Sequence, residues 1–305
     1  MVQKILIDTD IGDDIDDALA IALAVNSPEL EIVGITTVFK NTERRAKMAV
    51  RQMEVMSASL VPVCAGIDTA LVGERVGLDS DAFDKNGRFI PCQYTDDMDS
   101  LSYDQRHACD FIIECANRYP GELVIVGLGA LTNIAIAIRK APEIVGKLKN
   151  ITLMGGYFYP TDNYFDWNTR CDPEAARIVY TSGVHVNAVG LDVTKDCGLS
   201  MKWVRDLKTH QTPWVRFLDT QMRTWLNQTT LPCPILHDPL AIASLIDPSL
   251  LTFKKEFVHI NLRESYGTTQ VVSDASSFGT SAVNVAVSAD TPRFMSLFLD
   301  RILDF

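Results

Sequence analysis

The sequence predicts an α/β fold in which a single domain, residues 1–305, has a mostly parallel central sheet flanked by helices, Rossmann-like in arrangement. Short apolar runs rich in β-branched residues alternate with segments of helical period along the first two thirds of the chain. Unusual polar residues gather directly after the apolar runs. Because helices cover both faces of a parallel sheet, its strands are apolar throughout, and ligands bind at their carboxyl ends.

The expected elements follow one another in strand–helix order. Strands are expected at 4–7, 31–38, 60–64, 122–126, 150–154 and 184–191. Helices are expected at 16–26, 42–57, 104–118, 131–140 and 173–182. The last of these helices shows the clearest signals, with Asp172 as N-cap, Pro173 in the first turn and Gly183 as the stop. This alternation is typical of a sheet built from βαβ units.

The last third of the chain reads as a helical and β elaboration of the same domain. Helices are expected at 203–209 and 214–228, strands at 253–261 and 269–273, and a final helix from Pro292. Residues 73–103 are rich in Asp and Gly with little periodicity, which predicts a long loop. A loop of this length is usually a lid, a binding loop or disordered.

Composition excludes several classes of protein. The net charge of −11 argues against nucleic acid or an anionic membrane as partner, while it suits a protein that binds a cation. The seven cysteines are scattered without a C-x-x-C pair, which predicts reduced, mostly buried thiols. The apolar run near the start is too short for a signal peptide, and no stretch of about 18 apolar residues occurs. We therefore expect a soluble, cytoplasmic protein.

An unusual concentration of carboxylates follows the first expected strand. Six aspartates lie within ten residues with no Lys or Arg among them: Asp8, Asp10, Asp13, Asp14, Asp16 and Asp17. Two unit charges about 6 Å apart repel by about 3 kcal/mol at an effective dielectric constant of about 20. A bound divalent cation would reverse this penalty, because hard cations take carboxylate and carbonyl oxygens as ligands.

Other interpretations of the acidic stretch remain open at this point. An acidic first helical turn explains Asp13 or Asp14, but not Asp8 and Asp10, whose side chains share one face of a strand end. An EF-hand is excluded, because the spacing of glycine and the final acid is wrong. A haloacid-dehalogenase-like phosphatase also begins with a strand and Asp-x-Asp, although that class usually has Thr or Val where this chain has Gly12.

Five segments in order give a specific resemblance. Asp8-Thr-Asp10-x-Gly-x-x-x-Asp16-Asp17-Ala resembles the signature of the inosine–uridine-preferring nucleoside hydrolases, with two extra residues before the Asp pair. Further segments of that family are matched by ITTVFKN (35–41), GALTNIA (129–135), LMGG (153–156) with DWNTRCDPEAA (166–176), and HDPLA (237–241). The resemblance implies a calcium-dependent enzyme that hydrolyses ribonucleosides to ribose and free base in nucleoside salvage, as a homodimer or homotetramer.

The resemblance also implies the ligands of one Ca²⁺ ion. These are Asp10, Asp17, Asp238 and the backbone carbonyl of Leu128. Three carboxylates and a carbonyl form the hard oxygen site that calcium prefers. Asp16 would accept hydrogen bonds from the ribose hydroxyls, and the remaining strand-end aspartate, Asp8, would orient its neighbours.

Two residues are implied to catalyse the reaction, which passes through an oxocarbenium-like transition state. Asp10 would take the proton of the attacking water, and His237 would protonate the departing base. Positive charge that develops on the ribose favours the ring of carboxylates around it. A protein that keeps the fold but only binds a nucleoside or a metal is the non-catalytic alternative, with the phosphatase as the other rival.

The remaining predictions concern the nucleoside. Asn168 and Asn41 match asparagines that bind the ribose in the family, although Asn41 suits a helix cap equally well. Asp166 stands where the family usually has Glu at the ribose 5′ end, and Asn163 is a candidate to replace another asparagine. Trp225 is the candidate to stack on the base, ahead of a second tryptophan, Trp214. Residues 73–103 contain no histidine, so they lack the family's base-binding His-Gly motif.

Overall fold

The protein is built around one large sheet, seen in a computed structural model that describes residues 2–73, 77, 81–273 and 281–303. Within these residues nine strands pair in the order β10-β9-β11-β8-β7-β6-β1-β2-β3. Six neighbouring strands pair in parallel: β1 (Gln3–Thr9), β2 (Leu30–Thr37), β3 (Val63–Ala65), β6 (Val124–Gly127), β7 (Asn150–Met154) and β8 (Val186–Val189); a seventh, β11 (Ala282–Ala289), continues the parallel run beside β8. The predicted mostly parallel α/β sheet is therefore confirmed.

The strand order creates a switch point between β1 and β6. Counted along these six strands alone, from the β3 edge, the order is third, second, first, fourth, fifth and sixth, as in doubly wound folds. Chain connections leave β1 and β6 in opposite directions, so a crevice opens beyond their carboxyl ends. The aspartates that follow β1 and the Leu128 carbonyl that follows β6 consequently lie beside each other, and Leu128 N donates to the Asp8 carbonyl at 2.7 Å.

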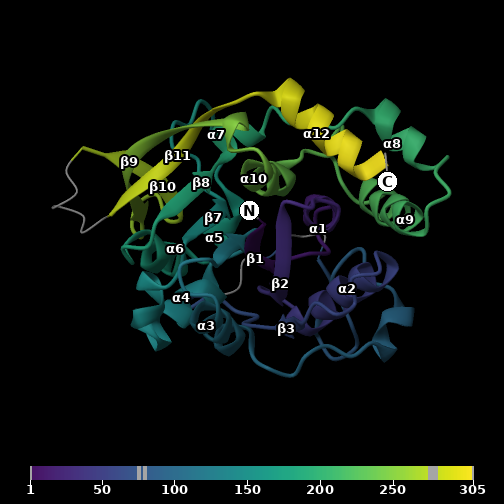
Figure 1. The fold of residues 1–305 in the computed structure, drawn as a ribbon, viewed down its shortest axis with the longest axis horizontal. Helices are drawn as coiled ribbons and strands as arrows, with labels where there is room; N and C mark the ends of the chain where they lie inside the picture. Colours follow the sequence, from purple (N-terminus) through teal and green to yellow (C-terminus); the bar gives the residue numbers. More distant parts are fainter. Residues whose placement is uncertain (1, 74–76, 78–80, 274–280, 304–305) are drawn as a thin grey trace.

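Helices cover both faces of the sheet (Figure 1). One layer holds α1 (Asp16–Val25), α2 (Thr42–Val55), α10 (His237–Ile246) and α12 (Thr291–Leu303). The opposite layer holds α3 (Ala108–Arg118), α4 (Thr132–Lys140) and α6 (Pro173–Tyr180). Side chains of β1 alternate between the two layers: Ile5 and Ile7 belong to the first apolar cluster and Leu6 to the second. Each face of the sheet thus has its own core.

The last third extends the sheet rather than forming a separate unit. Strand β11 (Ala282–Ala289) pairs parallel to β8 and antiparallel to β9 (Leu251–Asn261), and β10 (Thr268–Val272) closes the edge. Helices α8 (Met201–Leu207) and α9 (Pro213–Leu226) agree with the expected pair within a few residues. In this part of the chain the longest elements that were not predicted from sequence are β11 and α10 (His237–Ile246). Helix α10 is buried from Asp238 to Leu245, so its sequence shows no amphipathic period.

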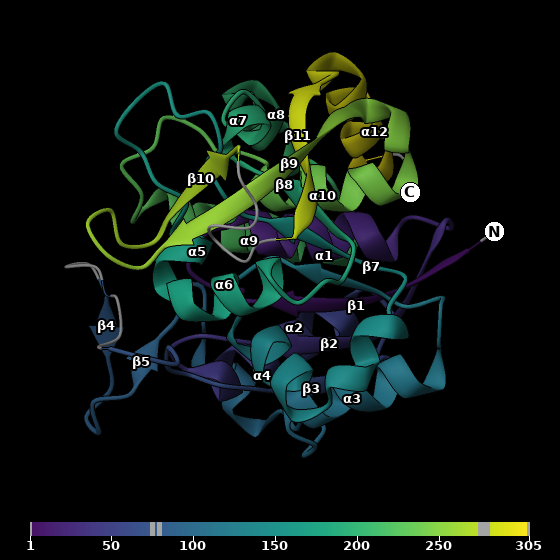
Figure 2. The ribbon, with the colours of Figure 1, turned by 90° about the vertical axis from the view of Figure 1, so that its left-hand side faces the viewer.

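The long segment after β3 has structure of its own. It contains the two-stranded hairpin β4 (Ala82–Phe83) and β5 (Phe89–Ile90) and the short helix η1 (Asp96–Ser100). Residues 74–76 and 78–80 of the loop expected at 73–103 lie outside the described residues. Figure 2 shows the hairpin beyond the carboxyl end of β1, on the side away from the N-terminus. Among the described helices, none combines the length and apolarity needed to cross a membrane.

Candidate active site

A pocket of about 500 Å³ lies at the switch point. Its floor comes from the loop after β1 and from the first turns of α1 and α10, and Leu128 and Met154 line it from the ends of β6 and β7. The short helix α5 (Trp167–Cys171) and the end of α9 supply further walls. The pocket therefore collects side chains from segments that are far apart in sequence, as the switch point of a doubly wound sheet does.

Three carboxylates converge on the floor of this pocket. Asp16 and Asp17 open α1, Asp238 lies in the first turn of α10, and one oxygen of each lies within 4.8 Å of the other two. All three are buried. Burial, followed by the charges of neighbouring aspartates, raises the pKa of each well above its usual range. The packing of α1 against α10 brings these residues together.

The chemistry of this cluster fits a divalent cation. Across the described part of the chain no Lys or Arg forms a salt bridge with Asp16 or Asp238. Asp17 accepts a hydrogen bond from the Thr9 hydroxyl, and Asp16 Oδ2 accepts one from the Asp238 backbone N–H at 3.3 Å. These two hydrogen bonds do not offset the mutual repulsion and the desolvation of three buried carboxylates. A +2 ion among oxygen ligands would do so.

Asp10 and Leu128 lie in the same pocket, beside the three converging carboxylates. Burial raises the pKa of Asp10 to about 6, while the Arg45 guanidinium opposes that rise. A Cβ added to Gly129 would lie only 2.9 Å from Asp10 Oδ1, so a residue without a side chain is needed there. Asn168 Nδ2 donates to the Leu128 carbonyl at 2.7 Å. That contact fixes the carbonyl and leaves its second lone pair for another partner.

Asp8 lies beneath the pocket rather than in its lining. Its Oδ1 accepts hydrogen bonds from Thr36 Oγ1 at 2.6 Å and from Asn133 Nδ2 at 2.8 Å. Burial raises the pKa of this carboxyl to about 7, against the effect of these two hydrogen bonds. Asn133, from the GALTN segment, also donates to the Thr37 carbonyl. The Asp8–Asn133 contact thus joins β1 to the start of α4 below the site.

His237 lines the pocket at the first position of α10. Its Nδ1 lies 2.7 Å from the hydroxyl of Thr194, the last residue of α7 (Leu191–Thr194). Burial lowers the pKa of the imidazole to about 4, so the ring is neutral at pH 7. With the Thr194 hydroxyl as donor to Nδ1, the ring proton stands on Nε2. Sequence reasoning found His237 but missed Thr194, which lies in no recognisable motif.

The structure brings three of the predicted nucleoside-binding residues to the pocket: Asp166, Asn168 and Trp225. Trp225, near the end of α9, also packs in the apolar core. Asp166 caps α5 and accepts the Thr169 N–H at 2.7 Å. Asp166 therefore acts as a structural cap as well as a wall of the pocket.

Two predicted residues lie elsewhere. Asn41 is the N-cap of α2, where it accepts the Arg44 N–H at 3.2 Å and donates to the Phe89 carbonyl at 2.8 Å. It lies behind the pocket lining rather than in it. Asn163 is exposed on the loop before α5 and is not part of the lining. The contacts of Asn41 are thus those of a helix N-cap.

One wall of the pocket was not predicted residue by residue. We call residues 81–94 the wall segment. Its pocket-lining members are Asp81, Ala82, Phe89, Ile90, Pro91, Cys92 and Tyr94. The described part of the loop expected at 73–103 therefore forms a wall of the pocket. Its sequence signalled only a long loop rich in Asp and Gly, because its contacts depend on the folding of α2 and of the loop that follows β1.

The fold and the site define a class of protein: a doubly wound α/β enzyme whose buried carboxylates form an oxygen-rich site at the switch point. The chain matches the family described as inosine-uridine preferring nucleoside hydrolase over residues 5–296, and it belongs to that family. It is therefore a hydrolase of the N-glycosidic bonds of ribonucleosides. Family membership also decides against the haloacid-dehalogenase-like phosphatase.

Individual relatives agree with this assignment along nearly the whole chain. Uridine nucleosidase 1 of Arabidopsis thaliana is 33% identical over 270 residues, which are 85% of this chain and 78% of that protein. An inosine-uridine preferring nucleoside hydrolase of Crithidia fasciculata is 31% identical over 319 residues, covering 99% of this chain and 98% of its own. The solved structure of a purine-preferring ribonucleoside hydrolase from Gardnerella vaginalis matches with a TM-score of 0.84 at 31% identity, covering 98% of both chains.

Proposed function

We propose that this protein is a calcium-dependent ribonucleoside hydrolase that releases ribose and a free base in nucleoside salvage. The observation that carries the calcium dependence is the convergence of Asp16, Asp17 and Asp238, buried, within 4.8 Å and without a salt-bridge partner for Asp16 or Asp238 in the described chain. Calcium favours six to eight oxygen ligands at about 2.3–2.6 Å. A site that already holds several carboxylates and a carbonyl supports that choice.

Asp10, Asp17, Asp238 and the Leu128 carbonyl are the proposed ligands. A bound Ca²⁺ would supply the positive charge that lowers the pKa of a water molecule in the pocket. Asp10, which lies in the pocket beside the proposed ion, accepts the proton of that water. Asp16 has its second oxygen available to accept hydrogen bonds from ribose hydroxyls. The carboxylates around the ribose stabilise the positive charge that develops as the glycosidic bond breaks.

His237 is proposed to assist the departing base. Because burial keeps its imidazole neutral, the ring offers the base no stored imidazolium; in the tautomer in which the Thr194 hydroxyl donates to Nδ1, it offers an Nε2–H donor instead. A hydrogen bond from Nε2 stabilises the negative charge that the base acquires as the bond breaks. Trp225 offers its indole face to the base, and Asn168 and Asp166 contact the ribose.

One assay tests the proposal directly. Release of reducing sugar from inosine, uridine, cytidine and adenosine is measured before and after chelation, and again after Ca²⁺ or Mg²⁺ is restored. We expect turnover that chelation abolishes and Ca²⁺ restores best. Turnover that survives complete removal of the metal would rule out the calcium dependence. Binding of nucleosides without any turnover would leave only the non-catalytic alternative.

A structure with the cation bound tests the ligands. Anomalous scattering should place one ion between Asp10, Asp17 and Asp238, with oxygen distances of about 2.3–2.6 Å. An ion held instead by Asp16, Asp17 and Asp238 would exchange the roles proposed for Asp10 and Asp16. The cytoplasmic location and the homodimer or homotetramer are also proposals, to be tested by cell fractionation and by sedimentation.

A further inference from the structure

Lys40 is a buried lysine on an unusual backbone. Phe39 and Lys40 have φ angles of 67° and 57°, in the left-handed region that residues with side chains rarely adopt. Their N–H groups donate to the carbonyls of Ile67 and Asp68 at 2.8 and 2.9 Å, which holds the turn in place. Only 2% of the Lys40 side chain is exposed. Strained backbone and a desolvated charge persist together only where surrounding contacts compensate for both.

The Lys40 ammonium contacts three groups that line the pocket. Nζ lies 2.7 Å from Asp81 Oδ1, 3.5 Å from Asp13 Oδ2 and 4.2 Å from the centre of the Phe89 ring. Asp13 belongs to the acidic loop, residues 10–15, whereas Asp81 and Phe89 belong to the wall segment. Lys40 therefore joins the two sides of the pocket. The buried Arg45 lies beside it, pairing with Asp13 at 2.9 Å and lying 5.6 Å from the centre of the Phe89 ring, and Lys40 adds the ion pair with Asp81.

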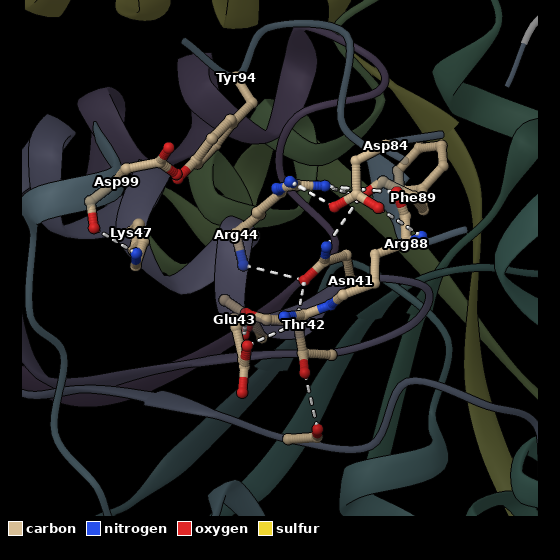
Figure 3. A network of polar contacts seen from close by, with 12 residues as sticks. Asn41, Thr42, Glu43, Arg44, Lys47, Asp84, Arg88, Phe89, Tyr94 and Asp99 are labelled. Carbon is tan, nitrogen blue, oxygen red and sulfur yellow. Dashed lines mark hydrogen bonds and ion pairs between the residues drawn. The ribbon is translucent and has the colours of Figure 1, made fainter. Parts of the chain in front are cut away.

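Other contacts hold the outer side of the wall segment. Arg44 donates to the Phe89 carbonyl at 2.8 Å and pairs with Asp84 at 2.8 Å. Figure 3 shows Arg44 between Asp84 and Asn41, with Arg88 beside them. These residues anchor the hairpin to α2 from outside. Lys40 differs from Arg44 because its partners Asp81, Asp13 and Phe89 all line the pocket, while a further ring contact, at 5.7 Å, is with the adjacent Phe39.

We propose that Lys40 is a positioning residue, which holds the wall segment against the acidic loop and so fixes the shape of the pocket around the nucleoside. The inference rests on the proposed function, since the enclosed ligand is the nucleoside. Lys40 acts through Asp81 and Phe89 and takes no part in bond cleavage. Loss of its charge should loosen the wall in the ground state and the transition state alike, which raises KM and leaves kcat almost unchanged.

The left-handed backbone offers a sharp experiment. Glycine and asparagine both tolerate positive φ, so Lys40→Gly and Lys40→Asn remove the ammonium while keeping or relieving the backbone conformation. We expect both variants to fold, with KM for uridine and inosine raised about tenfold and kcat changed less than about threefold. Hydrogen exchange of amides at 81–90 should accelerate in both. Lys47→Met is the matched control, because Lys47 binds the Asp99 carbonyl, outside the pocket, and should change neither quantity.

A double-mutant cycle with Asp81 completes the test. If the two residues act as one contact, Asp81→Asn should raise KM as the Lys40 variants do, and the double variant should be no worse than either single one. An unchanged KM and unchanged exchange at 81–90 in Lys40→Gly would overturn the inference. A fall in kcat with KM unchanged would overturn it as well. A wild-type protein without turnover would instead refute the proposed function, and the exchange measurement would still test Lys40.

Discussion

At the scale of single residues, the role proposed for His237 is to assist the leaving base. If Nε2–H stabilises the departing base, His237→Ala should lower kcat far more than it raises KM, by about 10²–10⁴-fold on natural nucleosides. The loss should be small for a nitrophenyl riboside, because nitrophenolate departs without help. Steady-state kinetics on both substrates measures the contrast. An equal fall in kcat on the two substrates would indicate that His237 only shapes the pocket.

Thr194 is expected to set the orientation and the tautomer of that imidazole. Thr194→Val keeps the shape of the side chain but removes the hydroxyl 2.7 Å from Nδ1. We expect kcat on uridine to fall about 2–10-fold, the effect of one hydrogen bond worth about 0.5–1.5 kcal/mol. Thr220→Val, on the exposed face of α9, is the control and should leave kcat unaltered. A Thr194→Val enzyme with normal kcat would show that packing alone orients the ring.

At the scale of elements, Asn41 at the N-terminus of helix α2 makes two kinds of contact: it caps the helix, and it binds the wall segment. Asn41→Ala removes the cap of α2 and the bond to the Phe89 carbonyl, so we expect the free energy of unfolding to fall by about 1 kcal/mol. Asn41→Asp keeps an acceptor for the Arg44 N–H and should retain most of that stability. Denaturant unfolding and kcat/KM are measured on both. A normally stable Asn41→Asp enzyme with a large loss of kcat/KM would support the direct ribose contact that the resemblance implies.

The alternating elements were predictable because each has its own periodicity or cap. Strands β1, β2, β6 and β7 were located within a few residues from apolar runs alone. Helix α10 and strand β11 were not, because α10 is apolar on all sides and β11 acquires its partners only when β8 and β9 are in place. Local sequence carries no signal for pairing of that kind.

The candidate site, like the fold, was predictable from the sequence only in part. Carboxylates at strand ends and the HDP motif identified the acidic floor and His237 without any structure. The wall segment, Thr194 and Lys40 were missed, because each acts through a contact between distant parts of the chain. The structure also adds Asp16 to the carboxylates that converge on the pocket floor, where it lies with Asp17 and Asp238.

For the molecule as a whole, buried carboxylates couple its stability to pH. Burial raises the pKa of Asp8 to about 7 and the pKa values of Asp10 and Asp14 to about 6, and it raises those of the three converging carboxyls well above 3.8. In the unfolded chain such groups release their protons near pH 4. Between about pH 4 and 7 the folded, metal-free protein therefore binds more protons than the unfolded chain. Its stability must fall as pH rises through that window.

Bound Ca²⁺ should remove this dependence of stability on pH, because the ion takes the place of the protons on the same carboxylate oxygens. A ligand that binds only the folded state at 100 times its Kd adds about 2.7 kcal/mol. For a chain of this size we expect chelation to lower Tm by about 5 °C or more at pH 7.5, and by much less at pH 5, where protons compete with the ion. Melting curves at both pH values, with chelator and with saturating Ca²⁺, measure the effect. In the Asp16→Asn/Asp238→Asn variant, chelation should lower Tm by less than in the wild-type protein, and the Tm of the metal-free variant should change less with pH. A metal-free protein whose Tm rises from pH 5 to 7.5 would contradict the coupling.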